Sequence, residues 1–287
     1  MMVHLAVTGG LFDYLFRAGE ANINLESADS AYPPEWGKIM HQANCLQSFY
    51  YSNSKNWLPN HLDAINHFLL DSGIFSLVYG AAKGRISDQQ IIDYTDRYAD
   101  YVQQFHIKHY FEMDLDAIIG EKQVRILRDR LESKVGWQCI PVWHINRGKN
   151  GYLADIKDHP YIAIAGLANY RGKGRKILEP LFPWLIDQAH EHHSWIHALG
   201  YTNMSKLQSG KYRFDSVDST AWVFGNMSGT IFTFNGQTII KHKAPKGKKL
   251  KTRKAAAQNF AAWVKYASML DSAYPNYFPC DNPQGWN

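Results

Sequence analysis

The chain has 287 residues, of which 45% are hydrophobic and 14% aromatic, a composition that excludes a disordered protein and allows a sizeable core. Its formal net charge is +5, and its three widely separated cysteines exclude a disulfide framework and a CxxC zinc site. Neither a signal-peptide pattern nor an apolar run long enough to span a membrane is present. We therefore expect a cytoplasmic protein of one large or two small domains, with no membrane partner.

Seven short apolar segments that end in polar or glycine residues predict strands. Between most of them lie helical patterns, such as residues 87–105, where Ser87 is a plausible N-cap. Strands that alternate with helices predict βαβ units and a mainly parallel sheet. The seven predicted strand segments are residues 3–10, 67–73, 109–116, 138–146, 161–169, 194–202 and 213–220.

Residues 229–240 supply an eighth predicted strand, or else a small hairpin that turns at Asn235 and Gly236. Eight βα units form a TIM barrel, and the length of the chain suits one; a doubly wound open sheet is the alternative. We predict an α/β protein with a (β/α)8 barrel over residues 1–240. A short basic extension, residues 241–287, contributes one helix and a tail packed on the barrel, without a zinc subdomain.

Basic residues are concentrated in two places. Residues 241–254 contain eight Lys or Arg and no acid, so that removing their charge from +5 leaves −3 for the remainder. Residues 171–176 form a smaller cluster. Such clusters are either solvated loops or contacts to the phosphate backbone of a nucleic acid. The candidate nucleic-acid-binding residues are Arg171, Lys173, Arg175, Lys176, Lys246, Lys248, Lys249, Lys251, Arg253 and Lys254.

Polar residues recur where the predicted strands end. Singly, each could be a helix cap, a turn residue or a satisfied core histidine. In a TIM barrel, however, the carboxyl ends of the strands meet at one face and form the active site, so together they predict one site. The residues at these ends are Asp71, Asp114, Asp116, Trp143, His144, Gly166, His197, Gly200, Asp215 and Asp218.

Two carboxylates that face one ligand suit two reactions. One is glycoside hydrolysis; the other is base exchange at the glycosidic carbon of a nucleoside, where one carboxylate attacks the sugar and another moves protons. Metal-dependent hydrolysis is a third possibility, but the histidine-rich residues 190–193 fall late in a helical pattern and suggest a solvated helix end. We expect no metal and no cofactor.

Five short motifs resemble those of tRNA-guanine transglycosylases, in the same order and at similar spacing between about residues 3 and 240. "LDSGIF" resembles the family's DSGG(Y/F) motif, and "FDSVDST" resembles its FDxVxPT segment. The others resemble its substrate-reading Asp, its Gly-Gly-Leu loop and a short glycine-containing loop. The five stretches are residues 70–75, 113–116, 164–169, 197–203 and 214–220.

The resemblance implies specific roles. Asp215 would be the nucleophile that attacks the sugar, Asp71 the general base, and Asp114 the acceptor for the N–H edge of guanine. Gly166 and Leu167 would offer backbone groups to the same base, which must leave the nucleic acid stack to reach them. The remaining predicted substrate-binding residues are Ser72, Gly73, Phe75, Asp116, Trp143, His144, His197, Gly200 and Asp218.

Departures from the family pattern also carry information. The family's zinc-binding cysteines are absent, since Cys280 is the only cysteine late in the chain, and Ile74 replaces a motif glycine. Asp218 is a second acid three residues beyond Asp215, so either could be the nucleophile. A compact chain with a basic segment looks more like the phage and bacterial paralogues that insert 7-deazaguanine bases into DNA. The alternatives are a tRNA substrate, a noncatalytic nucleic-acid-binding barrel and a barrel glycosidase.

Overall fold

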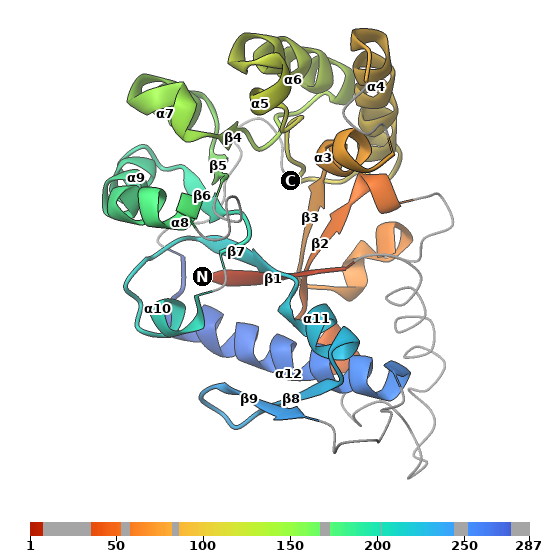
Figure 1. The fold of residues 1–287 in the computed structure, drawn as a ribbon, viewed down its shortest axis with the longest axis vertical. Helices are drawn as coiled ribbons and strands as arrows, with labels where there is room; N and C mark the ends of the chain where they lie inside the picture. Colours follow the sequence, from red (N-terminus) through yellow and green to blue (C-terminus); the bar gives the residue numbers. More distant parts are fainter. Residues whose placement is uncertain are drawn as a thin grey trace.

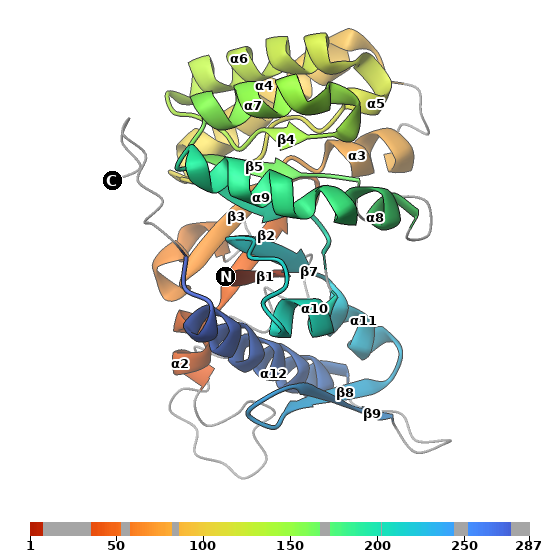
Figure 2. The same ribbon diagram turned by 90° about the vertical axis from the view of Figure 1, so that its left-hand side faces the viewer.

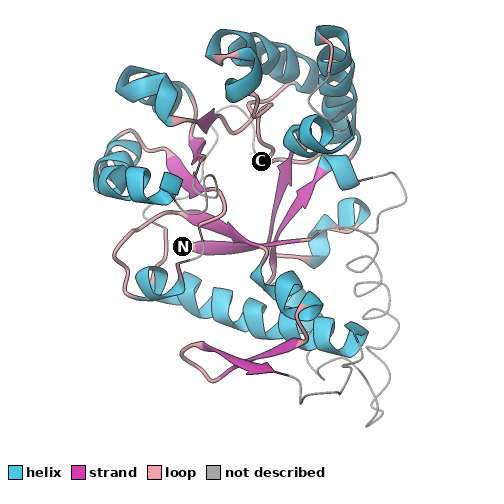
Figure 3. Ribbon diagram, viewed as in Figure 1, coloured by secondary structure: helices cyan, strands magenta, loops and turns pink. Residues whose placement is uncertain are grey.

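The fold is mixed α/β, with helices arranged around a curled parallel sheet (Figure 1 and Figure 3). The computed structural model describes residues 1–7, 36–52, 58–81, 86–166, 173–201, 203–243 and 252–276. Among the helices in these ranges, none combines the length and the apolar character that a membrane span requires.

Seven parallel strands form the main sheet, in the order β3-β2-β1-β7-β6-β5-β4. Residues 109–112 lie between its two edge strands: Tyr110 makes a parallel bridge to Leu70 of β3, and Phe111 makes one to Ile140, just before β4. The sheet is therefore a curled half-barrel of parallel strands. The strands are β1 (Met2–Ala6), β2 (Asn44–Ser48), β3 (His67–Asp71), β4 (Val142–Trp143), β5 (Tyr161–Ile164), β6 (Trp195–Ala198) and β7 (Ser216–Ser219).

Helices connect the strands and cover the outside of the sheet (Figure 2). The α-helices are α2 (Trp36–His41), α3 (Ile74–Ser76), α4 (Asp88–Gln104), α5 (Asp116–Ile119), α6 (Glu121–Val135), α7 (Gly148–Asp158), α8 (Lys173–Leu178), α9 (Phe182–Glu191), α10 (Met204–Gln208), α11 (Ala221–Met227) and α12 (Thr252–Ala273). Short 3-10 turns span Phe49–Tyr51, Leu58–Asn60, Leu62–Ala64, Ile145–Arg147 and Glu179–Leu181, and a π turn spans Leu77–Ala81.

The start of α4 confirms the predicted cap. The Ser87 hydroxyl accepts a hydrogen bond from the Gln90 backbone N–H at 3.2 Å, and the Gln90 side chain accepts one from the Ser87 N–H at 2.9 Å. This reciprocal pair satisfies two backbone donors that a helix start would otherwise leave open. The apolar face of the helix buries Ile91, Tyr98 and Val102 against the sheet.

Alternation along the strands sorts side chains between two faces of the sheet. Leu69 and Phe111 pack in an inner cluster of strand residues, whereas Leu70 and Val217 pack in the outer core with the helices. Because successive side chains of a strand point to opposite faces, Asp71 shares the inner face with Leu69. The same alternation determines which acidic side chains of β7 point to the inner face of the sheet.

Strand β2 was not among the predicted strands. Its five residues are all buried, yet Asn44, Gln47 and Ser48 are polar, so no apolar run marks it in the sequence. The Asn44 side chain accepts a hydrogen bond from the Asn66 amide at 2.8 Å, which gives one of the buried polar side chains of this strand a partner. A buried parallel strand usually reads as a continuous apolar run, and this one does not.

Residues 229–240 do not form the eighth strand of the main sheet, as one prediction proposed. They contribute to a separate antiparallel hairpin, β8 (Thr230–Phe234) and β9 (Ile239–Lys243), as the alternative prediction stated. The turn follows Asn235 and uses Gly236 at a φ of +94°, a conformation that glycine adopts without strain. The predicted boundary at residue 240 thus falls inside β9.

The hairpin packs on α12, which in turn lies beside β1 (Figure 2). Asn259 on α12 accepts a hydrogen bond from the Phe232 backbone N–H at 2.6 Å and donates one to the Thr230 carbonyl at 3.0 Å. At the other end of α12, the amino group of Met1 pairs with Asp271 at 3.2 Å. The C-terminal helix is therefore attached to both the hairpin and the first strand.

Candidate active site

Asp71 is an acid with a strongly perturbed environment at the carboxyl end of β3. Burial raises the pKa of its carboxyl to about 6; the backbone N–H of Gly73 opposes this rise, and the negative charges of Asp114 and Asp218 add to it. The carboxylates of Asp114 and Asp218 therefore lie near enough to act on Asp71 at this face. A carboxyl group with a pKa near neutrality is suited to proton transfer.

Asp218 is held in place by a residue of β6 and one just after it. Its Oδ1 accepts a hydrogen bond from the Gly200 N–H at 2.5 Å and lies 3.3 Å from Nε2 of His197. Its side chain keeps 14% exposure. Both contacts fall on the same oxygen, so the carboxylate is oriented while remaining accessible.

A chain of hydrogen bonds continues inward from Asp218. Nδ1 of His197 lies 2.6 Å from the Ser216 hydroxyl, which in turn lies 2.5 Å from the Tyr161 hydroxyl. If Tyr161 donates to Ser216 and Ser216 donates to Nδ1, then Nε2 of His197 carries the proton and donates it to Asp218. His197 is fully buried, so it supports Asp218 from below and does not face a ligand.

Asp215 lies elsewhere. It precedes β7, at the amino end of the strand, and is only 1% exposed. Its Oδ2 accepts a hydrogen bond from the Ile196 N–H at 2.9 Å and lies 2.9 Å from Nε2 of His190. Because Asp215 and Asp218 are three residues apart, they point to opposite faces of the strand. The predicted nucleophile is therefore not brought together with Asp71, whereas Asp218 is.

Asp114 and His144 form a close pair, with 2.6 Å between Oδ1 and Nε2. Burial lowers the pKa of His144, but its hydrogen bond to Asp114 and the negative charge of that residue outweigh burial and raise the pKa overall. Both side chains are partly exposed, at 32% and 18%. The pair offers a charged acceptor and a donor to a polar ligand.

One group of three potential metal ligands occurs among the described residues. Atoms of Asp114, Asp116 and His144 lie within 4.8 Å of one another. However, both carboxylate oxygens of Asp116 are taken by Arg147, at 2.7 Å from Nε and 2.6 Å from the terminal nitrogen. With one ligand neutralised by a guanidinium, the group is poorly suited to hold a cation.

Asp116 belongs to a buried ionic network and not to the ligand-facing surface where it was predicted. Arg147 also pairs with Glu112 at 3.0 Å and with Asp155 at 3.2 Å. Arg128 completes the network, 2.7 Å from Glu112 and 2.9 Å from Asp155. This network joins the segment between β3 and β4 to α6 and α7, and so fixes the backbone that carries Asp114.

We expect Arg147→Met to lower the free energy of unfolding by about 3–5 kcal/mol, because it leaves buried carboxylates without their partner. Arg130→Met is the matched control, since Arg130 is 48% exposed and pairs with Asp96 at the surface, outside the network; it should cost no more than about 1 kcal/mol. Urea unfolding of the two variants measures the difference. Equal midpoints would contradict a structural role for the network.

The other predicted site residues fall into two groups. Ser72 and Trp143 are buried, and the Trp143 indole donates to the Gly148 carbonyl at 3.0 Å, so their side chains serve packing. Gly73, at a φ of +65°, Gly166, at +86°, and Phe75, 57% exposed, lie at the strand ends as predicted.

The side chains of most predicted nucleic-acid-binding residues, and Leu167 of the predicted base-binding loop, lie outside the described part of the structure. Lys176 is exposed on α8. Lys173 and Arg175 on α8, and Arg253 and Lys254 on α12, are described by their backbone alone. Leu167, Arg171, Lys246, Lys248, Lys249 and Lys251 lie outside the described residues.

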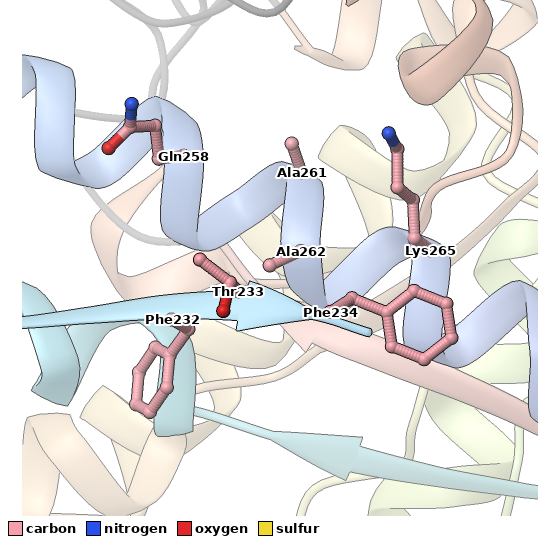
Figure 4. Close-up of a pocket in the computed structure, with 7 residues that line it drawn as sticks. All are labelled: Phe232, Thr233, Phe234, Gln258, Ala261, Ala262 and Lys265. Carbon is pink, nitrogen blue, oxygen red and sulfur yellow. The ribbon is translucent and has the colours of Figure 1, made fainter. Parts of the chain in front are cut away.

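A shallow pocket lies between β8 and α12, away from the carboxylates (Figure 4). Its lining contains Phe232, Phe234 and Lys265 but no acid or histidine. It therefore lacks the pair of proton-transfer groups that the strand ends provide.

In comparisons with known proteins, no family model and no curated protein matches the chain.

Proposed function

We propose that this protein is a base-exchange transglycosylase, a pentosyltransferase that replaces guanine in DNA with a 7-deazaguanine base. Asp218 is the nucleophile and Asp71 the general base. One observation carries the proposal: at the carboxyl end of a parallel sheet, Asp218, oriented by Gly200 and His197, lies near Asp71, whose pKa is raised mainly by burial and further by the charges of Asp114 and Asp218. The motif resemblance supports the same chemistry, with the nucleophile moved from Asp215 to Asp218.

We also infer that the sheet closes into an eight-stranded barrel, with residues 109–112 as its short eighth strand. The two bridges of this segment support closure, because they join β3 to the residue before β4. The register supports it too. We followed the paired residues from Asp218 around the sheet, through β1, β2, β3, this segment, β4, β5 and β6. The path returns to the line of β7 at residue 210, eight residues before its start. A shear of eight is that of TIM barrels.

The reaction has two displacement steps. In the first, the Asp218 carboxylate attacks C1′ of the target nucleotide, the C1′–N9 bond breaks, and guanine leaves with the electron pair and takes a proton from solvent. In the second, the Asp71 carboxylate removes the N9 proton of the incoming base, whose nitrogen attacks C1′ and releases Asp218. Splitting one difficult substitution into two steps is the advantage of a carboxylate nucleophile.

Asp114 and His144 serve base recognition in this proposal. The Asp114 carboxylate accepts hydrogen bonds from the N–H edge of guanine or of the 7-deazaguanine, and His144 orients it. DNA is favoured over tRNA because the chain, with its basic residues 241–254, looks more like the paralogues that insert 7-deazaguanine bases into DNA. A tRNA substrate is the second candidate.

The test is a release assay. Pure protein is incubated with guanine-labelled DNA or tRNA and a 7-deazaguanine base, and the released guanine is counted. We expect release from DNA that depends on the added base. Release from tRNA alone would keep the chemistry and change the substrate, whereas no release from either would contradict the proposed function.

A further inference from the structure

Most of the exposed large apolar side chains lie in segments that follow strand ends. Eight large hydrophobic side chains are exposed among the described residues, and six of them lie in the loops and short helices that follow strand ends. The two others, Ile126 on α6 and Ile240 on β9, lie elsewhere. We call the six the apolar rim: Tyr51, Phe75, Tyr79, Ile118, Ile145 and Ile177. Apolar groups gathered in this way mark a contact surface.

The aromatic members of the rim lie on two neighbouring segments. Tyr51 follows β2, and Phe75 and Tyr79 follow β3, with their ring centroids 4.4 Å apart. Gly73 brings the segments together, since a Cβ atom on it would lie only 2.6 Å from the Cβ of Tyr50. The aromatic rings therefore occupy the edge of the site next to Asp71.

The backbone beneath these rings is fixed. The Tyr94 hydroxyl donates to the Ser72 carbonyl at 2.7 Å, and the Phe49 ring packs against Tyr94 and Tyr98 at 5.2 Å. The rings themselves stay 50–57% exposed for Tyr51, Phe75 and Tyr79. Rigid segments that present exposed rings bind planar ligands at a small entropic cost.

We propose that the aromatic part of the rim stacks against the bases that flank the exchanged nucleotide, and that the substrate is bound as single-stranded DNA. This inference rests on the proposed function. Every base has a face for aromatic stacking, so such a surface binds without sequence preference. Asp71, Asp114 and Asp218 repel phosphates, so the bases must point toward the site. A duplex presents the opposite arrangement, with its phosphates outside.

Binding measurements test the proposal directly. Fluorescence anisotropy compares a labelled guanine-containing single strand with the same sequence as a duplex, without an incoming base. We expect tighter binding of the single strand by the unaltered protein. Tyr79→Ala and Tyr51→Ala should each weaken single-strand binding about 5- to 100-fold, as expected for the loss of one stacked base.

Matched variants separate stacking from general damage. Tyr79→Phe keeps the ring and should bind like the unaltered protein, and Ile126→Ala removes an exposed apolar side chain outside the rim and should have no effect. Single-strand binding that is insensitive to both tyrosine substitutions would overturn the proposal, as would a preference for the duplex.

The binding assay is independent of catalysis. Tyrosine-dependent single-strand binding without guanine release would preserve the rim as a nucleic-acid surface and reject base exchange. Guanine release together with tyrosine-independent binding would support base exchange and reject the rim as a nucleic-acid surface.

Discussion

Asp218→Asn is expected to abolish guanine release, with a loss of at least about 10⁴-fold, while Asp215→Asn keeps it. An amide at position 218 cannot form the ester bond to C1′, although it can still accept the hydrogen bond from the Gly200 N–H. Asp215 lies at the opposite end of the strand, so we expect little change in rate at that position. The amide oxygen can still accept the bond from Ile196, which limits the expected loss of stability to about 1–3 kcal/mol.

The covalent intermediate gives a second readout. Incubated with DNA and no incoming base, the unaltered protein and Asp215→Asn should yield an adduct that survives denaturing electrophoresis, and Asp218→Asn should yield none. The opposite pattern, an adduct that needs Asp215, would contradict the placement of the nucleophile at the carboxyl end of β7.

The difference between these two acids shows what the sequence could and could not specify. The motif resemblance placed the nucleophile at Asp215, the first acid of "FDSVDST". Strand alternation alone could have separated the two acids, because residues three apart on a strand lie on opposite faces. The sequence does not show which face of the strand points into the sheet. The packing of Val217 in the outer core shows that Ser216 and Asp218 point inward.

Other features depend on contacts between distant parts of the chain. Apolar runs that end in polar or glycine residues predicted six of the seven main-sheet strands and the site acids Asp71 and Asp114, because these signals are local. Asp116 looked equivalent to Asp114 in the sequence, yet it pairs with Arg147, which lies 31 residues away. Such pairing is set by tertiary packing, and neither periodicity nor motif spacing encodes it.

Asp71→Asn is expected to lower the rate of base exchange by about 10²- to 10⁴-fold, the usual contribution of a general base. In the unaltered protein, Asp71 must be ionised to remove the N9 proton. Burial is the largest cause of its raised pKa of about 6 and persists when Asp218 is bonded to C1′, so kcat/KM for the incoming base should rise between about pH 5 and pH 7 and then level off. A flat profile across this range would contradict the role of Asp71 as the base.

The same substitution should make the protein more stable at neutral pH. The folded pKa of about 6 exceeds the ordinary value of 3.8, so the folded state holds this proton more tightly than the unfolded chain does. The favourable contribution is fully present below pH 3.8 and is lost as the pH rises through 6. Above that, the partly buried carboxylate destabilises the fold, and asparagine carries no charge.

We therefore expect Asp71→Asn to raise the free energy of unfolding by about 1–3 kcal/mol at pH 7, with the gain shrinking toward pH 4. Urea unfolding at the two pH values measures it, with the exposed Asp63→Asn as the control that should show neither change. A variant that loses activity and also stability at pH 7 would mean that Asp71 serves the fold. A loss of rate with a gain in stability is what distinguishes an acid kept for chemistry, because the protein then carries a partly buried charge that its fold does not need.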